Sequence, residues 1–222
     1  CIHDYLYVDS NTANSIYSYF YEQHSFSEIP TDKKIIIENY TDKGRKYVVV
    51  HSLYGRRVND CLSRAVAFSI AKSQHKDVEL GITDNGFYVA YEKNVNVSAA
   101  MKLLKSEKLE LIMLNAIERT EILKRRFRHC ASRSLMILRN YMGRKKRVGR
   151  QQVSSMILIN AVKRISPDFC ILKEARREVL EDLMDMPTTK NILKAIEDKK
   201  IKLKNVQTDM PSPFAFKIVL ES

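Results

Sequence analysis

The strongest chemical signal in the sequence is a run of cationic side chains in its second half. Residues 124–150 contain eleven lysines and arginines and no aspartate or glutamate. They are Lys124, Arg125, Arg126, Arg128, Arg133, Arg139, Arg144, Lys145, Lys146, Arg147 and Arg150. Arginine binds phosphate oxygens two at a time through its planar guanidinium, and lysine acts as a point charge. Because the whole chain has a formal net charge of +12, we expect a partner that carries phosphate.

Two predicted elements hold these cations. Residues 117–140 have helical periodicity, which would put the arginines on the flanks and outer face of a helix. The apolar side chains expected to line its buried stripe are Ile122, Phe127, Ala131, Leu135 and Leu138. Residues 143–150 are predicted to form a basic loop before the next helix, whose free N-terminal amides also attract anions. Tyr141, just before this loop, is the candidate for stacking on a base.

A group of carboxylates at residues 174–185 is the second feature that could do chemistry. Its members are Glu174, Glu178, Glu181, Asp182 and Asp185. Paired carboxylates can transfer protons or hold two metal ions. Lys173, Arg176 and Arg177 lie within the same segment at helical spacing, so we predict salt bridges instead. The core stripe expected for this helix is Leu172, Ala175, Val179 and Leu183.

The sequence contains no motif that would make the chain an enzyme by itself. It has neither a Gly-x-Ser-x-Gly elbow nor a Gly-x-x-x-x-Gly-Lys-Ser/Thr phosphate loop, so we expect no ATP hydrolysis by this chain alone. His51 and His129 are predicted to be structural. The cysteines, at positions 1, 61, 130 and 170, are too far apart for a zinc site and indicate reduced, buried thiols in a cytoplasmic protein. No apolar run is long enough to span a membrane, and we expect no membrane partner.

The elements that must position these side chains predict an α+β fold. Residues 1–96 are expected to form a mixed lobe with a helix at 11–24, two hairpins at 34–52 and 77–91, and a long helix after Gly55. Residues 97–222 are expected to form a mainly helical lobe with a terminal β return. Its predicted helices are 97–114, 117–140, 150–165, 168–185 and 187–198, and its strands are 200–206 and 214–220. We take residues 1–222 as one accessory domain, and the missing initiator Met suggests a piece of a longer polypeptide.

Seven strings along the chain carry a family resemblance. They are Ile-Pro-Thr-Asp at 29–32, Val-His-Ser-Leu-Tyr-Gly-Arg-Arg-Val-Asn at 50–59, Asp-Asn-Gly-Phe at 84–87, Arg-Phe-Arg at 126–128 with Ala131 and Arg133, Gly-Arg-Gln-Gln at 149–152, Leu-Lys-Glu-Ala-Arg-Arg-Glu-Val-Leu at 172–180 with Asp182 and Asp185, and Pro-Ser-Pro-Phe-Ala at 211–215. Together these strings resemble the DEAD/H-associated region of large helicase-related (Lhr) proteins, which are superfamily 2 ATP-dependent helicases.

The resemblance implies a parent enzyme that uses ATP and Mg²⁺ to move along single-stranded DNA and to unwind duplexes, including RNA–DNA hybrids. Its ATPase motifs would lie upstream of this chain. The resemblance also implies packing beside motor and winged-helix domains, along the path of the tracking strand. A tryptophan can stack on a base in that family, whereas this chain has none. Either another side chain replaces it or that contact is lost.

We therefore expect the cations of residues 125–150, together with Arg56 and Arg57, to hold DNA phosphates without reading base sequence. Gly55 and Asn59 are expected to shape the turn into the long helix. The simplest alternative is that the cations form a solvent-exposed face whose charge is balanced by acidic residues elsewhere in the fold. The lack of acidic residues within the cationic run disfavours this alternative. A second alternative is a docking module that braces the motor domains without touching nucleic acid. A third is a nuclease that uses the acids of residues 174–185.

Overall fold

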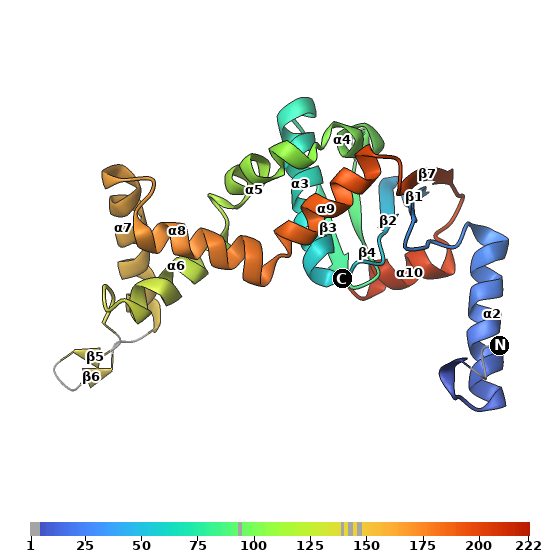
Figure 1. Ribbon diagram of the computed structural model, residues 1–222, viewed down its shortest axis with the longest axis horizontal. Helices are drawn as coiled ribbons and strands as arrows, with labels where there is room; N and C mark the ends of the chain where they lie inside the picture. Colours follow the sequence, from blue (N-terminus) through green and yellow to red (C-terminus); the bar gives the residue numbers. More distant parts are fainter. Residues whose placement is uncertain (1–4, 93–94, 139, 142–143, 146–147) are drawn as a thin grey trace.

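The computed structural model describes residues 5–92, 95–138, 140–141, 144–145 and 148–222 (Figure 1). The described residues form a five-stranded sheet in the order β3-β4-β2-β1-β7. Its strands are β1 (Lys34–Asp42), β2 (Arg45–His51), β3 (Glu79–Thr83), β4 (Gly86–Tyr91) and β7 (Lys202–Gln207). The β1–β7 pair is parallel and the other three pairs are antiparallel. Both predicted hairpins are thereby confirmed.

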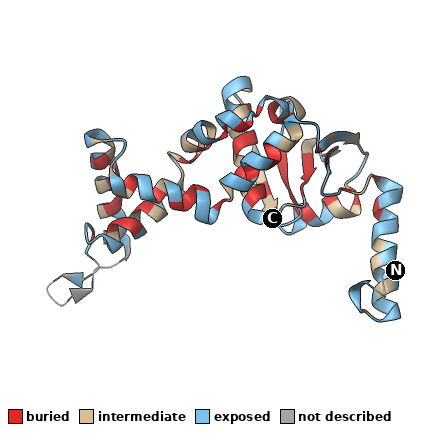
Figure 2. Cartoon of the chain, in the orientation of Figure 1, coloured by how far each residue is buried: buried red, intermediate tan, exposed pale blue. Residues whose placement is uncertain are grey.

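Each face of the sheet is covered by a helix. Val48 and Val50 of β2 belong to the large core that includes α3 (Arg56–Gln74). Val49 between them packs with Ala215 and Ile218 of α10 (Pro213–Leu220). Successive side chains of a strand point to opposite faces, so a β-branched run buried on both sides follows directly from the sequence. Figure 2 shows this buried sheet with α3 and α10 against it.

The turn into α3 depends on a glycine and a buried asparagine. Gly55 has a φ angle of 87°, in the left-handed region that glycine adopts without strain. The side-chain Nδ2 of Asn59 lies 3.0 Å from each of the carbonyl oxygens of Ser52, Thr83 and Asp84. The amide therefore ties the end of β2 to the β3–β4 turn. These contacts confirm the prediction that Gly55 and Asn59 shape this turn.

The helices between β4 and β7 build the rest of the molecule. They are α4 (Val97–Leu103), η1 (Ser106–Lys108), α5 (Leu109–Ile117), α6 (Glu121–Arg133), α7 (Val148–Ile165), α8 (Cys170–Arg177), the π-helix η2 (Glu178–Leu183) and α9 (Met186–Glu197). Helices α6, α7 and α8 form a bundle at the end of the molecule far from α2 (Ser10–Phe26), as Figure 1 shows. The short ladder β5 (Asn140–Tyr141) and β6 (Arg144–Lys145) extends from that bundle. Within the described ranges, no helix is long and apolar enough to cross a membrane.

The last predicted strand, at residues 214–220, is wrong, because these residues belong to helix α10. Ser212 caps this helix by accepting a hydrogen bond from the backbone N of Ala215 at 3.3 Å, and Pro213 occupies its first turn. Phe214 packs against Tyr19 and Phe20 of α2, with ring centroids 4.9 and 5.3 Å apart. The apolar residues of 214–220 alternate as in a strand. The capping Ser212 and the proline in the first turn favour a helix, and the helix forms.

The β return joins the first lobe rather than the second. Strand β7 pairs in parallel with β1, and α10 covers the second face of the same sheet. The predicted lobe of residues 97–222 must therefore be amended, since residues 202–220 lie with the mixed lobe. The physical reason is that β1 would otherwise leave a sheet edge with unpaired backbone groups. The predicted α+β fold class is confirmed.

The predicted helix at residues 117–140 is too long at both ends. Helix α6 begins after Thr120, whose Oγ1 accepts a hydrogen bond from the backbone N of Leu123 at 3.4 Å. It ends at Arg133, and Leu135 follows with a left-handed φ of 62°. Leu135 is 73% exposed and Leu138 is 40% exposed, so neither belongs to the buried stripe.

A one-residue shift in helical phase explains the other error in the predicted core. In η2 the backbone N of Met184 donates to the carbonyl of Val179 at 3.0 Å, an i→i+5 bond of a π-helix. The three predicted core residues that precede the shift are buried as predicted; they are Leu172, Ala175 and Val179. After it, Met184 is buried and Leu183 is 37% exposed. The π turn thus moves a leucine from the core to the surface.

Candidate nucleic-acid interface

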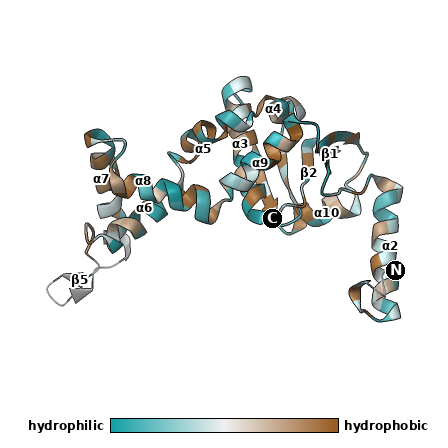
Figure 3. Ribbon diagram, viewed as in Figure 1, coloured by the Kyte–Doolittle hydropathy of each residue, from teal (hydrophilic) through white to brown (hydrophobic). Residues whose placement is uncertain are grey.

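Helix α6 carries the described part of the predicted basic face, the cations of residues 124–150. Its apolar side packs against the core of the helical bundle. Leu123, Phe127 and Ala131 are fully buried, and Ile122 packs partly buried against the same core. These side chains fix α6 against α7 and α8. The outer side of α6 is hydrophilic, as Figure 3 shows. Its cations, at least partly exposed, are Lys124, Arg125, Arg126, Arg128 and Arg133.

Two of these arginines share one buried carboxylate. Nη1 of Arg126 lies 3.4 Å from Oε2 of Glu178, and Nη2 of Arg133 contacts the other carboxylate oxygen. The side chain of Glu178 is only 6% exposed, and such burial requires compensating charge. The hydrogen bond to Glu178 raises the pKa of Arg133 further above its ordinary value. Sequence reasoning missed this contact, because Glu178 lies on η2, 52 and 45 residues after the two arginines of α6, and no local periodicity connects it to them.

The other cations of α6 are differently placed. Lys124 pairs with Glu121 at 2.6 Å, one turn away. Arg125 and Arg128 make no ion pair or hydrogen bond with the residues that the structure describes. An external phosphate would meet these two guanidinium groups without displacing an internal partner. On α6 the predicted basic face therefore has two arginines without an ion pair among the described residues, two that Glu178 holds, and one lysine that Glu121 holds.

The second half of the predicted face falls largely outside the described residues. Arg139, Lys146 and Arg147 lie outside them, as do the side chains of Tyr141, Arg144, Lys145 and Arg150. The backbone at residues 140–141 and 144–145 is described and forms the β5–β6 ladder, with Tyr141 opposite Arg144. The predicted basic loop thus includes a short hairpin.

The first turn of α3 meets the end of η2 beside this face. Nη2 of Arg57 donates to the carbonyl oxygen of Glu181 at 2.5 Å, and the backbone N of Asp185 donates to the carbonyl of Arg57 at 3.4 Å. Arg56 is exposed at the start of the same helix. Asp60, one turn further along α3, lines a cavity that α6 also lines. The structure therefore brings two predicted contributors, separated by about 70 residues of chain, to one junction.

Four of the five carboxylates of residues 174–185 are engaged in ion pairs, and the fifth, Asp185, accepts a hydrogen bond from the backbone N of Thr188. Arg177 lies 2.8 Å from Glu174, 3.3 Å from Glu181 and 3.6 Å from Asp182. The hydrogen bond from Arg177 lowers the pKa of Glu174. Among the described residues, no group of three or more His, Cys, Asp or Glu side chains could hold a metal ion. The predicted salt bridges are confirmed for Arg177, whereas Arg176 pairs with Glu118 at 3.0 Å instead. The arrangement gives the nuclease alternative no support.

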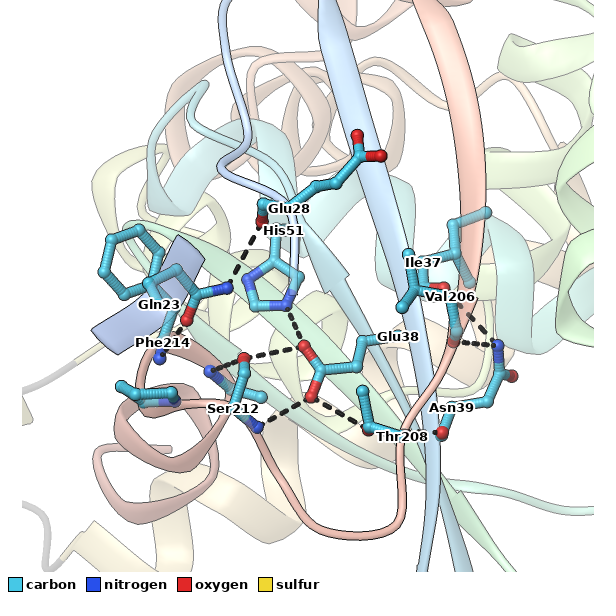
Figure 4. A network of polar contacts seen from close by, with 12 residues as sticks. Gln23, Glu28, Ile37, Glu38, Asn39, His51, Val206, Thr208, Ser212 and Phe214 are labelled. Carbon is cyan, nitrogen blue, oxygen red and sulfur yellow. Dashed lines mark hydrogen bonds and ion pairs between the residues drawn. The ribbon is translucent and has the colours of Figure 1, made fainter. Parts of the chain in front are cut away.

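His51 takes part in a buried polar network on the second face of the sheet (Figure 4). Its Nε2 lies 3.0 Å from Oε2 of Glu38, and both side chains are almost fully buried. Ser212 donates to the same carboxylate through its Oγ at 2.7 Å and its backbone N at 2.8 Å. The serine and the histidine both contact the glutamate instead of each other, so the network joins β1, β2 and the cap of α10. This geometry is structural, as predicted for His51.

The cysteines behave as predicted in two of the three described positions. Cys61 and Cys130 are buried free thiols, whereas Cys170 is exposed at the start of α8. Burial raises the pKa of Cys61 to about 12, so this thiol stays protonated and unreactive.

Replacing Glu178 by glutamine should release Arg126 and Arg133 toward an external phosphate. We expect the affinity for single-stranded DNA to rise about twofold to fivefold, and the free energy of unfolding to fall by about 1–3 kcal/mol. Fluorescence anisotropy and urea unfolding measure the two quantities. Glu174→Gln is the matched control, because it removes one charge from the same segment but affects only Arg177, which keeps its contacts with Glu181 and Asp182. Equal gains in affinity for both variants would show that net charge alone is responsible.

The comparisons with known proteins show the family of the chain. The family model described as DEAD/H associated matches residues 29–215. The ATP-dependent helicase Lhr-Core of Methanothermobacter thermautotrophicus is 47% identical over 221 residues, which cover 99% of this chain and 26% of that protein. The protein of the same name from Saccharolobus solfataricus is 40% identical, with 96% of this chain and 25% of that protein covered. The chain thus spans about a quarter of the length of these relatives.

A solved structure matches the fold as well. It is the helicase Lhr of Mycobacterium smegmatis bound to single-stranded DNA and AMP-PNP, with a TM-score of 0.82 and 26% sequence identity. The match covers 92% of this chain and 26% of the helicase. The sequence relatives above are also named as Lhr-type helicases. The chain belongs to the DEAD/H associated family, and its relatives are helicases of the Lhr type.

Proposed function

We propose that this chain is the nucleic-acid-binding accessory domain of an Lhr-type ATP-dependent DNA helicase. It positions the translocating single strand through phosphate contacts and has no catalysis of its own. The observation that carries the proposal is the placement of Arg125 and Arg128, exposed or partly exposed on α6 and without an ion-pair partner in the described residues. They stand at the start of a segment with eleven cations and no acid.

The related helicase that was solved with single-stranded DNA supports the choice of ligand. The parent enzyme would bind ATP and Mg²⁺ in motor domains outside this chain. We further propose that the parent enzyme also acts on RNA–DNA hybrids, in which the DNA strand that it tracks carries the same phosphates. Its motor and winged-helix domains would be the intramolecular partners of this chain.

Fluorescence anisotropy of labelled single-stranded DNA, over a series of salt concentrations, tests the proposal. Each neutralised phosphate of a single strand contributes about −0.7 to the slope of log K against log salt. Four to seven contacts predict a slope of about −3 to −5, so the affinity should fall roughly fiftyfold to a thousandfold between 50 and 200 mM salt. A weak or flat salt dependence would refute phosphate holding by the isolated chain.

A docking module that braces the motor domains is the second candidate. Exposed apolar side chains on α7 favour it, because Val153, Met156 and Ile157 are 57%, 50% and 66% exposed. In that case the anisotropy traces stay flat even at low salt, whereas the separate motor fragment binds the chain tightly. The two candidates thus predict opposite results in one pair of assays.

A further inference from the structure

A cavity of about 340 Å³ lies where the helical bundle meets α3. Its lining residues are Asp60, Ile122, Arg125, Arg126, His129, Leu183 and Met184. They come from three elements, α3, α6 and the end of η2. The volume falls in the range of pockets that hold small organic ligands, on the order of 300–1,000 Å³. The cavity is therefore large enough to hold more than a phosphate group.

One part of the lining is cationic. Arg125 has no ion-pair partner among the described residues, and Arg126 shares the single carboxylate of Glu178, at 3.4 Å, with Arg133. The carboxylate of Asp60 is already engaged by Arg64 at 2.6 Å. Two arginines thus face the cavity against one neutralised aspartate, and this arrangement favours an anion.

Another part of the lining is apolar, and it owes its position to the π-helix. The i→i+5 bond at Met184 shifts the helical phase, so Leu183 is 37% exposed at the rim of the cavity. Ile122 lines the cavity from α6 and is partly buried. The apolar side chain of Leu183 would make no favourable contact with a phosphate group alone. It suits a ligand that joins an anionic group to a flat apolar one.

We propose that this cavity holds one nucleotide of a bound single strand, with its phosphate on Arg125 and Arg126 and its base against Ile122 and Leu183. The inference rests on the proposed function and adds a contact to the base. Because the apolar wall is aliphatic, it does not distinguish one base from another. A duplex keeps its bases stacked and paired, so the cavity selects strands whose bases are free.

The test compares two oligonucleotides with equal numbers of phosphates, a dodecamer of thymidine and the same backbone made of abasic tetrahydrofuran units. The wild-type chain should bind the thymidine strand about fivefold or more tightly. Leu183→Ala should remove most of that preference and leave both the salt slope and the affinity for the abasic strand unchanged. Arg125→Ala should weaken both strands alike and reduce the salt slope by about 0.7.

Matched controls keep the result interpretable. Leu103→Ala removes a leucine that is 64% exposed on α4, and Arg164→Ala removes an exposed arginine of α7. Neither should change the preference for bases, and thermal unfolding confirms that each variant is folded. Equal affinity of the wild-type chain for both strands would overturn the inference while a steep salt slope would still support phosphate holding. If the wild-type chain binds neither strand at low salt, both this inference and the proposed function are overturned.

Discussion

Replacing Arg144, Lys145, Lys146 and Arg147 together by alanine should lower the affinity for single-stranded DNA about a hundredfold to a thousandfold at 0.1 M salt. Each phosphate contact contributes about −0.7 to the salt slope, so four lost contacts flatten the slope by about 3. The loss should be the same for every base sequence, since phosphates carry no sequence information. Anisotropy with several labelled strands measures both the loss and its uniformity.

The control for this variant removes four lysines elsewhere. They are Lys102 on α4, Lys105 just before η1, Lys108 at the end of η1 and Lys190 on α9, all exposed and away from the basic face. Their replacement by alanine removes the same total charge, but distant charges are screened at 0.1 M salt, where the Debye length is about 10 Å. We expect an effect below about threefold. Similar losses in both variants would mean that binding follows net charge and not the proposed face, and a loss confined to certain base sequences would contradict phosphate-only contacts.

Replacing Glu38 by alanine should lower the free energy of unfolding by about 3–5 kcal/mol. The carboxylate is fully buried and accepts hydrogen bonds from the Oγ and the backbone N of Ser212, and it contacts Nε2 of His51 at 3.0 Å. Removing it leaves these buried donors without a partner and loosens the cap of α10. Urea unfolding followed by circular dichroism measures the change. Glu79→Ala is the control, because Glu79 is an exposed glutamate of the same sheet, paired with Arg45, and should cost less than about 1 kcal/mol.

The same carboxylate predicts how stability depends on pH. Burial opposes ionisation of Glu38, but the hydrogen bonds from His51 and Ser212 outweigh it and keep the pKa of Glu38 below its ordinary value of 4.5. At a pH between the folded and unfolded pKa values, the unfolded chain binds a proton that the folded chain does not. Stability from this group is therefore complete above the unfolded value and is lost as the pH falls through the folded one. In Glu38→Gln the decline below pH 4.5 should be shallower, and an unchanged decline would assign it to other carboxylates.

Much of the fold could be predicted from local patterns. The β-branched runs around Asp42 and Gly86 alternate between two buried faces, and turn residues bound them, so both hairpins follow from the sequence. Residues 214–220 misled the prediction because their apolar residues alternate with the period of a strand. The cap at Ser212 and Pro213 opposed that pattern and decided the outcome. The pairing of β7 with β1 joins residues about 170 positions apart, which no local pattern reveals.

The candidate site, like the fold, was predictable in its local features and not in its long-range contacts. The basic composition of α6 and its buried side are visible in the sequence, since charge and helical period are local properties. The commitment of Arg126 and Arg133 to Glu178 is not visible, because these partners lie 52 and 45 residues apart. The exposure of Leu183 is not visible in the sequence either, since a single π turn shifts by one residue the phase that regular helical spacing predicts.

The most direct test of phosphate holding compares a single-stranded DNA with a peptide nucleic acid of the same base sequence, whose backbone has no charge. The two strands offer the same bases and differ in the groups that the cationic face is proposed to bind. At low salt we predict saturable binding of the DNA and at least about a hundredfold weaker binding of the uncharged strand. Equal affinities for the two strands would contradict the proposed function.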